Sequence, residues 1–167
     1  GQVTKVMQNL LAEGIPIRDV RTIAEALAEQ GAKSQDTDAL TARVRVALGR
    51  AICQSVTGVG REMTAITLDP QLEQLLQRTV QGGAGGLEPS LIENAINKIA
   101  DAAMRLEAEG STAVLLVSGG IRLLLSRLVR SRLPELHVLA YEEVPASKTI
   151  KVVEVIGGHA QLENASA

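Results

Sequence analysis

The stretch that decides the fold is residues 113–145, which read AVLLVSGGIRLLLSRLVRSRLPELHVLAYEEVP. It begins with a short apolar run, Ala113–Val117, and continues through a two-glycine turn into an amphipathic helical pattern over Ile121–Leu133. Pro134 interrupts this pattern, and a second apolar run follows at His137–Ala140. The order strand, helix, strand predicts a β-α-β unit, which is typical of the α/β class.

Outward from this unit, two further strands are predicted, over Met63–Leu68 and Thr149–Ile156. Helical patterns cover about ten residues after Pro70 and the segment from Glu88 to Glu109. Residues 58–158 are therefore expected to form a small α/β subdomain with a sheet of about four strands covered by helices. Residues 159–167 are expected to be a flexible tail.

The first third of the chain is predicted to be a helical subdomain over residues 1–57, with about three helices. The first helix carries an apolar face from Val3 to Leu11. The second begins at Asp19, a suitable N-cap, and the third follows Asp36 and has one buried stripe from Leu40 to Ile52. The whole chain is thus expected to be of α+β or α/β class.

Composition excludes several kinds of protein. The chain has 167 residues, a net charge of −2 and a single aromatic residue, Tyr141, so neither base stacking nor a basic duplex-binding surface is expected. Its only cysteine, Cys53, rules out an internal disulfide and a cysteine-based zinc site, and it is expected to be buried. No apolar run approaches the roughly 18 residues of a membrane span. The chain enters a helix immediately and lacks an initiator methionine, which suggests part of a longer protein.

Two glycine-rich segments are candidate anion sites. Ser118-Gly119-Gly120 joins a strand to a helix start, where backbone N–H groups and the helix dipole favour anions, and Arg122 adds a positive charge. The alternative is a tight structural turn, which is the favoured interpretation. The loop Gly82–Gly86 is followed by Leu87-Glu88 where a phosphate-binding loop needs lysine and serine or threonine, so a linker is expected there.

The helix over Ile121–Leu133 has a basic face. At 100° per residue, Arg122, Arg127 and Arg130 share one arc with Ser126, opposite the leucines. This arc is predicted to face outward, and these three arginines are the candidate protein-interaction surface. The alternative is a solvated face without a partner.

No catalytic, cofactor-binding or metal-binding set is predicted, and the chain is not expected to be an enzyme. His137 and His159 lie in different contexts and have no nucleophile or further ligands beside them. Glu142 and Glu143 follow a strand, but adjacent strand residues point to opposite faces, so they are not expected to converge.

Several runs resemble a known family. They are VTKVMQNLLAEGIPIRDVRTIAEALAEQG at 3–31, LTARVRVALGRAI at 40–52, GLEP at 86–89, the leucine- and arginine-rich stretch within 115–145, and IGG at 156–158. In this order they resemble the export-gate family of type III secretion, and in particular its flagellar members. The resemblance covers roughly residues 2–158. The chain departs from the family at Ser55-Val56-Thr57 and at Leu128, where aromatic residues are common.

The resemblance implies a place within a larger bacterial inner-membrane protein, whose cytoplasmic region has four subdomains. Residues 1–57 would be most of the third and residues 58–158 the fourth. Such regions assemble as rings, usually nonameric, and dock chaperone–substrate complexes and components of the export ATPase. Only the missing N-terminal part would contact the membrane.

Three alternatives remain beside the flagellar export gate. One is the equivalent domain of a virulence export gate, which the resemblance does not separate sharply from the flagellar branch. Another is a small α/β module that binds anions or nucleotides through Ser118–Arg122. The third is a scaffold subdomain whose interfaces are all intramolecular.

Overall fold

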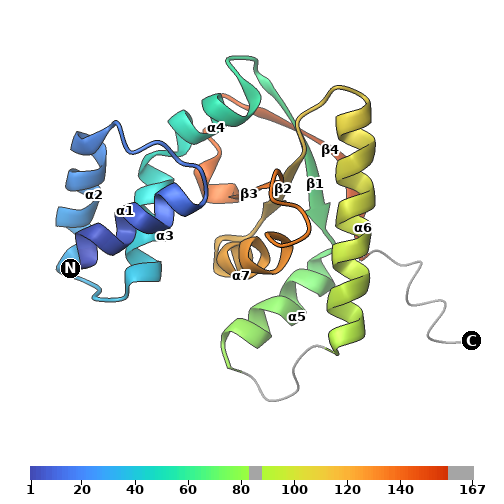
Figure 1. The fold of residues 1–167 in the computed structure, drawn as a ribbon, viewed down its shortest axis with the longest axis horizontal. Helices are drawn as coiled ribbons and strands as arrows, with labels where there is room; N and C mark the ends of the chain where they lie inside the picture. The colour runs from blue at the N-terminus through green and yellow to red at the C-terminus, as the bar shows by residue number, and fades with distance from the viewer. Residues whose placement is uncertain (83–87, 158–167) are drawn as a thin grey trace, which may run out of the picture. The chain divides into compact units, whose positions relative to one another are not determined.

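The computed structural model describes residues 1–82 and 88–157. The expected tail over 159–167 and the expected linker, apart from Gly82, lie outside the described residues. Contacts within the chain divide it into two units (Figure 1). The helical unit comprises Gly1–Val59 and Glu142–Pro145, and the α/β unit comprises Gly60–Tyr141 and Ala146–Ala167. The helical unit therefore includes a short segment from the C-terminal half of the chain.

The helical unit contains α1 (Gln2–Ala12), α2 (Val20–Gly31), α3 (Thr37–Ala47) and α4 (Gly49–Thr57). Asp19 caps α2 as predicted, because its side chain accepts a hydrogen bond from the Thr22 N–H. Asp36 caps α3 through the Asp38 N–H. The buried core of this unit includes Val6, Leu10, Ile15, Ile23, Leu40, Val44, Leu48, Ile52 and Cys53.

The single helix predicted after Asp36 is in fact two helices. Leu48 lies between α3 and α4 with φ −88° and ψ 4°, outside the helical region. A Cβ at the next residue, Gly49, would overlap the carbonyl oxygen of Glu143. Glycine at this position allows the main chain of the 142–145 segment to approach the helix closely. The buried stripe continues across the break, which is why periodicity alone did not reveal it.

The α/β unit is built on a sheet of four parallel strands in the order β3-β2-β1-β4. The strands are β1 (Glu62–Leu68), β2 (Val114–Val117), β3 (His137–Ala140) and β4 (Thr149–Ile156). The helices are α5 (Pro70–Val80), α6 (Pro89–Ala108) and α7 (Gly119–Val129), and the 3-10 turn η1 (Tyr141–Glu143) follows β3. All four predicted strands are present, so the α/β prediction is confirmed.

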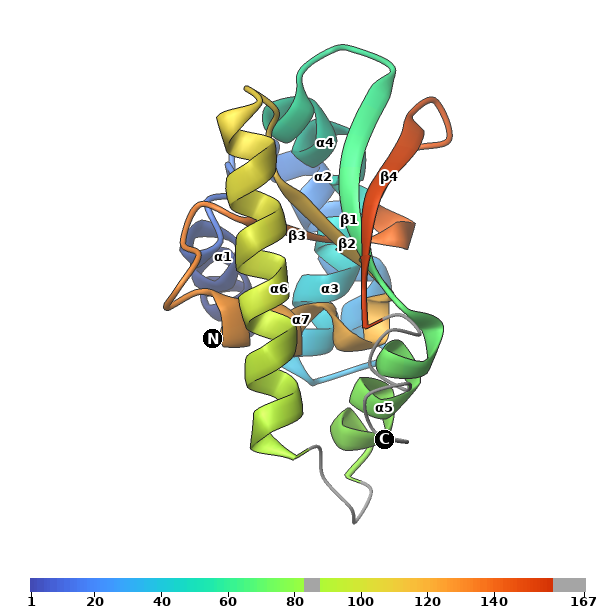
Figure 2. The same ribbon diagram turned by 90° about the vertical axis from the view of Figure 1, so that its right-hand side faces the viewer.

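The three helices of this unit share one core with one face of the sheet (Figures 1 and 2). Alternate strand residues Ile66, Leu68, Leu115 and Val117 pack with Leu72 and Leu76 of α5, Ile99 and Leu106 of α6, and Ile121 and Leu125 of α7. Both crossovers, β1 to β2 and β2 to β3, proceed in the same direction along the sheet. Right-handed crossovers in one direction place their helices on the same face, as observed.

Helix α7 is shorter than predicted. It ends at Val129, although the sequence pattern suggested a continuation to Leu133. Pro134 disfavours helical geometry at the residue before it, and the chain forms turns from Arg130 onward. Among the described residues, none of the helices combines the length and the apolar character that a membrane crossing requires.

Candidate functional site

The edge of the sheet where the strands end is the natural place for a ligand in an open parallel sheet. At this edge β1 ends at Leu68, β2 at Val117 and β3 at Ala140. Ser118 follows β2 directly and is the N-cap residue of α7, whose first N–H groups have no partner within the helix. The anion site that the sequence suggested at Ser118-Gly119-Gly120 therefore lies at the edge of the sheet where ligands commonly bind.

Two side chains of α5 occupy this edge. Glu73 accepts a hydrogen bond from the Ser118 N–H, at the position where a bound anion would lie. The side-chain amide of Gln77 lies against Gly120, where a Cβ would displace it. A carboxylate at this place repels an incoming anion, and the geometry supports a structural turn.

Arg122 does not complete an anion site either. Its side chain is only 5% exposed, and its Nη1 donates a hydrogen bond to the carbonyl oxygen of Val138 in β3 at 3.3 Å. The guanidinium is thus directed at main-chain oxygen of a neighbouring strand, where a buried charged group finds a partner. Ser118 and Arg122 are not brought together as a site, and the hypothesis of an anion- or nucleotide-binding module through Ser118–Arg122 loses its support.

The Glu73 carboxyl lies in an unusual electrostatic environment. Burial raises the pKa of Glu73 above its ordinary value, and the hydrogen bond from Ser118 opposes this in part. Its Oε1 atom is buried and has no hydrogen-bond partner among the described residues. Burial also raises the pKa of the nearby Tyr141 phenol, and the negative charge of Glu73 raises it further.

Glu73→Gln should change the pH dependence of stability. Because the pKa of Glu73 is raised, the folded state binds this proton more tightly, and the stability it contributes is lost as pH rises through the folded-state pKa. Glutamine does not titrate, so the stability of the variant relative to the native chain should increase as pH rises from the ordinary glutamate pKa towards the raised pKa of Glu73. Urea unfolding at several pH values measures this difference, and a difference that does not vary with pH would contradict it.

The same variant should lower the pKa of Tyr141 towards its ordinary value, because the nearby negative charge is removed. Tyr141 is the only aromatic residue, so an ultraviolet absorbance titration reports this phenol alone. An unchanged Tyr141 titration would show that the two side chains do not interact.

The predicted basic face of α7 is only partly correct. Arg127 and Arg130 are exposed, whereas Arg122 and Ser126 are buried. The prediction was wrong for Arg122 and Ser126. The buried face of α7 is wider than its row of leucines, because it also includes the side of the helix that contacts β3. Residues 127 and 130 remain as the exposed arginines of the candidate surface.

A buried ion cluster in the helical unit was not predicted. Arg45 of α3 is 2% exposed and binds Glu143 twice, with Nε–Oε2 at 2.6 Å and Nη2–Oε1 at 3.1 Å. Its Nη1 also donates to Oε2 of Glu13 at 2.5 Å. Buried Cys53 lies beside this cluster, with its Sγ 3.7 Å from the carbonyl oxygen of Glu143. The burial of Cys53 is as predicted.

The contacts with Arg45 also show how the adjacent residues Glu142 and Glu143 differ. Glu143 is buried in the ion cluster, whereas Glu142 is exposed, so the two carboxylates do not converge, as predicted.

The two histidines form no site among the described residues. His137 lies at the exposed start of β3, and His159 lies outside the described residues. Within residues 1–82 and 88–157, no group of histidine, cysteine and acidic side chains could hold a metal ion.

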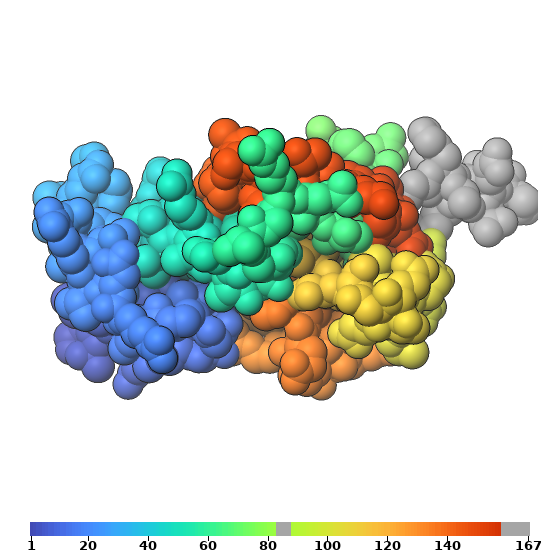
Figure 3. Space-filling model, turned by 90° about the horizontal axis from the view of Figure 1, so that it is seen from above, coloured from blue at the N-terminus to red at the C-terminus, as the bar shows by residue number. Residues whose placement is uncertain are grey.

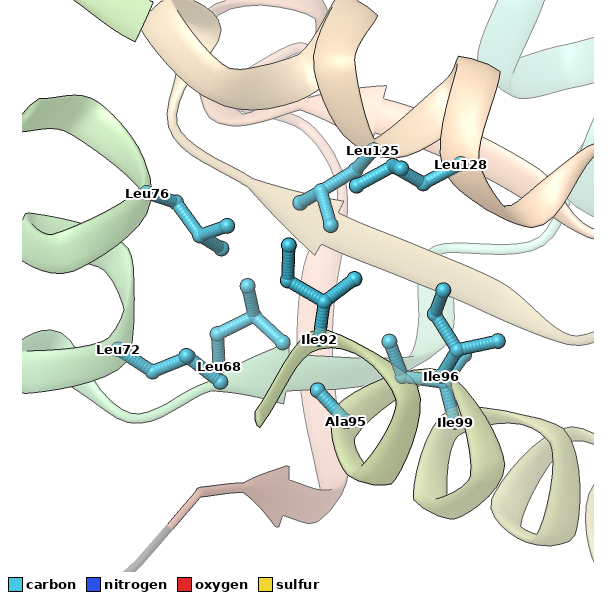
Figure 4. Close-up of a pocket in the computed structure, with 9 residues that line it drawn as sticks. All are labelled: Leu68, Leu72, Leu76, Ile92, Ala95, Ile96, Ile99, Leu125 and Leu128. Atoms are coloured by element: carbon cyan, nitrogen blue, oxygen red, sulfur yellow. The ribbon is translucent and has the colours of Figure 1, made fainter. Parts of the chain in front are cut away.

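An apolar pocket lies among the helices of the α/β unit (Figure 4). Its nine lining residues come from the end of β1 and from α5, α6 and α7, and all are apolar: Leu68, Leu72, Leu76, Ile92, Ala95, Ile96, Ile99, Leu125 and Leu128. A ligand pocket normally adds a few polar groups that orient its ligand, and this pocket has none. The pocket is therefore a space between packed apolar side chains.

Several solved structures share the fold of this chain. The fold is shared with Shigella flexneri MxiA, at 28% identity and a TM-score of 0.79 over 93% of this chain and 50% of that one. It is shared with Chlamydia pneumoniae CdsV, solved in complex with CdsO, at 28% identity and a TM-score of 0.77 over 93% of this chain and 46% of the other. The nonameric EscV cytosolic domain of the type III secretion system shares the fold at 24% identity and a TM-score of 0.76, with coverage of 92% and 46%. The fold is thus that of the cytosolic domains of type III secretion export gates.

The chain belongs to the FHIPEP family, whose sequence profile matches residues 1–149. It is 50% identical to the flagellar biosynthesis protein FlhA of Proteus mirabilis and 48% identical to FlhA of Salmonella typhimurium, over 154 residues in each case. These matches cover 92% of this chain and 22% of either relative. The chain therefore spans about a fifth of the length of these proteins, and the family resemblance seen in the sequence is confirmed.

Proposed function

We propose that this chain is part of the cytoplasmic region of a flagellar type III export gate in the bacterial inner membrane. In that setting it contributes to a ring-forming platform that docks chaperone–substrate complexes and export ATPase components. The observation that carries the proposal is the 50% identity to FlhA along 92% of the chain. Identity to the export-gate structures, such as MxiA at 28%, is lower, which favours the flagellar branch.

The proposal assigns the chain a binding role without catalysis. Its support is the site at the sheet edge, where Glu73 of the chain itself accepts the hydrogen bond from the Ser118 N–H that an anion would accept. Docking of another protein is supported by the solved complex of CdsV with CdsO, to which this chain is 28% identical in the CdsV part. Ring formation is supported by the nonameric assembly of the EscV cytosolic domain, which shares this fold.

Within this proposal, Arg127 of α7 and Arg130, which directly follows the helix, contact acidic surfaces of a docked protein. Both are exposed, and neither α7 nor its C-cap position at Arg130 carries an acidic residue. Clustered charge of one sign accelerates the encounter with a partner of opposite sign and fixes its orientation. Arg122, which the sequence analysis placed on the same surface, is excluded by its burial.

Reversing both charges, in Arg127→Glu with Arg130→Glu, should weaken capture of chaperone–substrate complexes or ATPase components by at least about tenfold. Pull-down with the complete cytoplasmic region measures this, and the loss should diminish at high salt, where charge attraction is screened. The matched control is Arg18→Glu with Arg21→Glu, two exposed arginines of the helical unit with the same change in charge. Unchanged capture in a folded α7 variant would favour a scaffold with intramolecular interfaces only.

A further inference from the structure

The sheet of the α/β unit has two edge strands, β3 and β4. Strand β3 is four residues long, whereas β4 is eight residues long and lies at the surface of the unit, where its residues appear in red (Figure 3). Strand β4 is hydrogen-bonded to β1 on one side, and no described segment pairs with its other side. An edge strand presents unpaired main-chain N–H and carbonyl groups, with which the same strand of another copy can pair. A strand as short as β3 offers few such groups, so the long edge of β4 is the one open to pairing.

The composition of β4 favours such pairing. Its sequence, TIKVVEVI, is rich in β-branched apolar residues, which have high β propensity. Val152, Val153 and Val155 are 50%, 42% and 50% exposed. Exposed segments with high β propensity associate through their edges unless charged residues interrupt them. The two charged residues of β4 are Lys151 and Glu154.

Both charged residues lie on the face of β4 that the helices cover. Lys151 aligns with Thr64 and Glu154 with Ile66, and the latter belongs to the core beneath the helices. Glu154 forms an ion pair with Arg105 of α6, whereas the Lys151 side chain is exposed. If two copies of β4 paired antiparallel about a two-fold axis, the covered faces of the two sheets would continue into each other, and Lys151 would lose water. Removal of an unpaired ammonium group from water costs free energy and therefore opposes the pairing.

A bulge makes the outer edge of β4 irregular. The first N–H and the last carbonyl oxygen of the strand both bond towards the β1 side, with nitrogen–oxygen distances of 2.6 and 2.7 Å. The alignment with β1 skips Val153, which is an extra residue in the bulge. Because main-chain direction alternates along a regular strand, the outward groups belong to Ile150 and Val152 before the bulge and to Val155 after it. Their spacing changes from two residues to three, so a regular partner strand matches only part of this edge.

We propose that Lys151 and the bulge at Val153 protect the outer edge of β4 from edge-to-edge pairing with other copies of the chain. The two features act on different requirements of pairing. The charge opposes the enclosure of the side chains, and the bulge interrupts the row of main-chain hydrogen bonds. This protection goes beyond the docking role proposed above. In the proposed ring, where copies of the chain lie close together, a protected edge leaves association to other surfaces.

Sedimentation velocity of the 167-residue chain over a range of concentrations tests the proposal. Lys151→Val combined with deletion of Val153 should raise the association constant at least about tenfold over that of the native chain, because both obstacles to pairing are removed. The deletion leaves the alignment with β1 unchanged on either side of the bulge, so β4 should still pair with β1. Each change alone should raise the association constant by a smaller factor.

Two control variants keep the charge or remove a charge elsewhere. Lys151→Arg retains a positive charge at the edge, and Lys33→Val makes the same change as Lys151→Val at an exposed position of the helical unit. Both should associate as the native chain does. Amide hydrogen exchange locates the contact, since the outward N–H groups of Ile150, Val152 and Val155 should be slowed only in the associating variants.

Circular dichroism establishes that each variant is folded, and Lys151→Val alone decides the test if the deletion unfolds the chain. A folded Lys151→Val chain that associates no more strongly than the native chain would overturn the proposal. Association whose slowed amides lie outside β4 would also overturn it. So would slowing of the outward β4 amides in the native chain as its concentration rises, because the edge would then pair despite the lysine and the bulge.

Discussion

Replacing Arg45 with methionine is expected to lower the free energy of unfolding by about 3–5 kcal/mol. The guanidinium is 2% exposed and makes two contacts with Glu143 and one with Glu13. Its removal leaves the Glu143 carboxylate, which is also 2% exposed, buried without its counter-charge. The cost of burying an uncompensated charge is much larger than the net value of the pair itself.

Urea unfolding followed by far-ultraviolet circular dichroism measures this loss. The matched control is Arg21→Met, which breaks the exposed Arg21–Glu25 pair of α2 and should cost less than about 1 kcal/mol. The double variant Arg45→Met with Glu143→Leu should be more stable than Arg45→Met alone, because it removes the unpaired carboxylate as well. A double variant that is no more stable than the single one would show that the charge of Glu143 is not the cause.

Replacing Leu115 with alanine is expected to cost about 2–5 kcal/mol. Leu115 is fully buried in β2, a central strand, and belongs to the core shared with all three helices of the α/β unit. The loss combines the transfer of the side chain from the core with the cavity that remains. Parallel sheet residues beneath covering helices relax little, because they are packed on all sides.

The comparison for this variant is Leu75→Ala in α5, where the leucine is 40% exposed and leaves no enclosed cavity. It should cost less than about 1 kcal/mol, since alanine also has the higher helix propensity. Circular dichroism reports on the whole chain, while the near-ultraviolet signal of Tyr141 reports on the α/β unit. Equal destabilisation by both leucine variants would mean that the core is not organised around β2.

Much of the fold could be predicted from local pattern. The helices over 2–12, 20–31 and 89–108 follow apolar residues spaced three and four apart, and Asp19 caps a helix where expected. The strands at His137–Ala140 and Thr149–Ile156 have the predicted bounds. These features depend on residues close together in the sequence, whose periodicity and caps carry the information.

The candidate site was harder to predict because its determinants are distant in sequence. The Ser118-Gly119-Gly120 turn was placed correctly, yet nothing nearby showed that Glu73 would fill its anion position. Arg45 and Glu143 are 98 residues apart, and no motif links them. Arg122 lies on a polar arc of its helix, and its burial depends on contact with Val138.

The sequence by itself determined the class of the protein, its family, the strand–helix order of 113–145 and the lack of a recognisable catalytic motif. These follow from short-range pattern and from runs of residue identity. Only the tertiary structure decided which charges are buried, why Gly49 must lack a side chain, and that β4 lies at the edge of the sheet. The physical reason is that burial, close approach and strand pairing arise between segments that the folded chain brings together from distant positions.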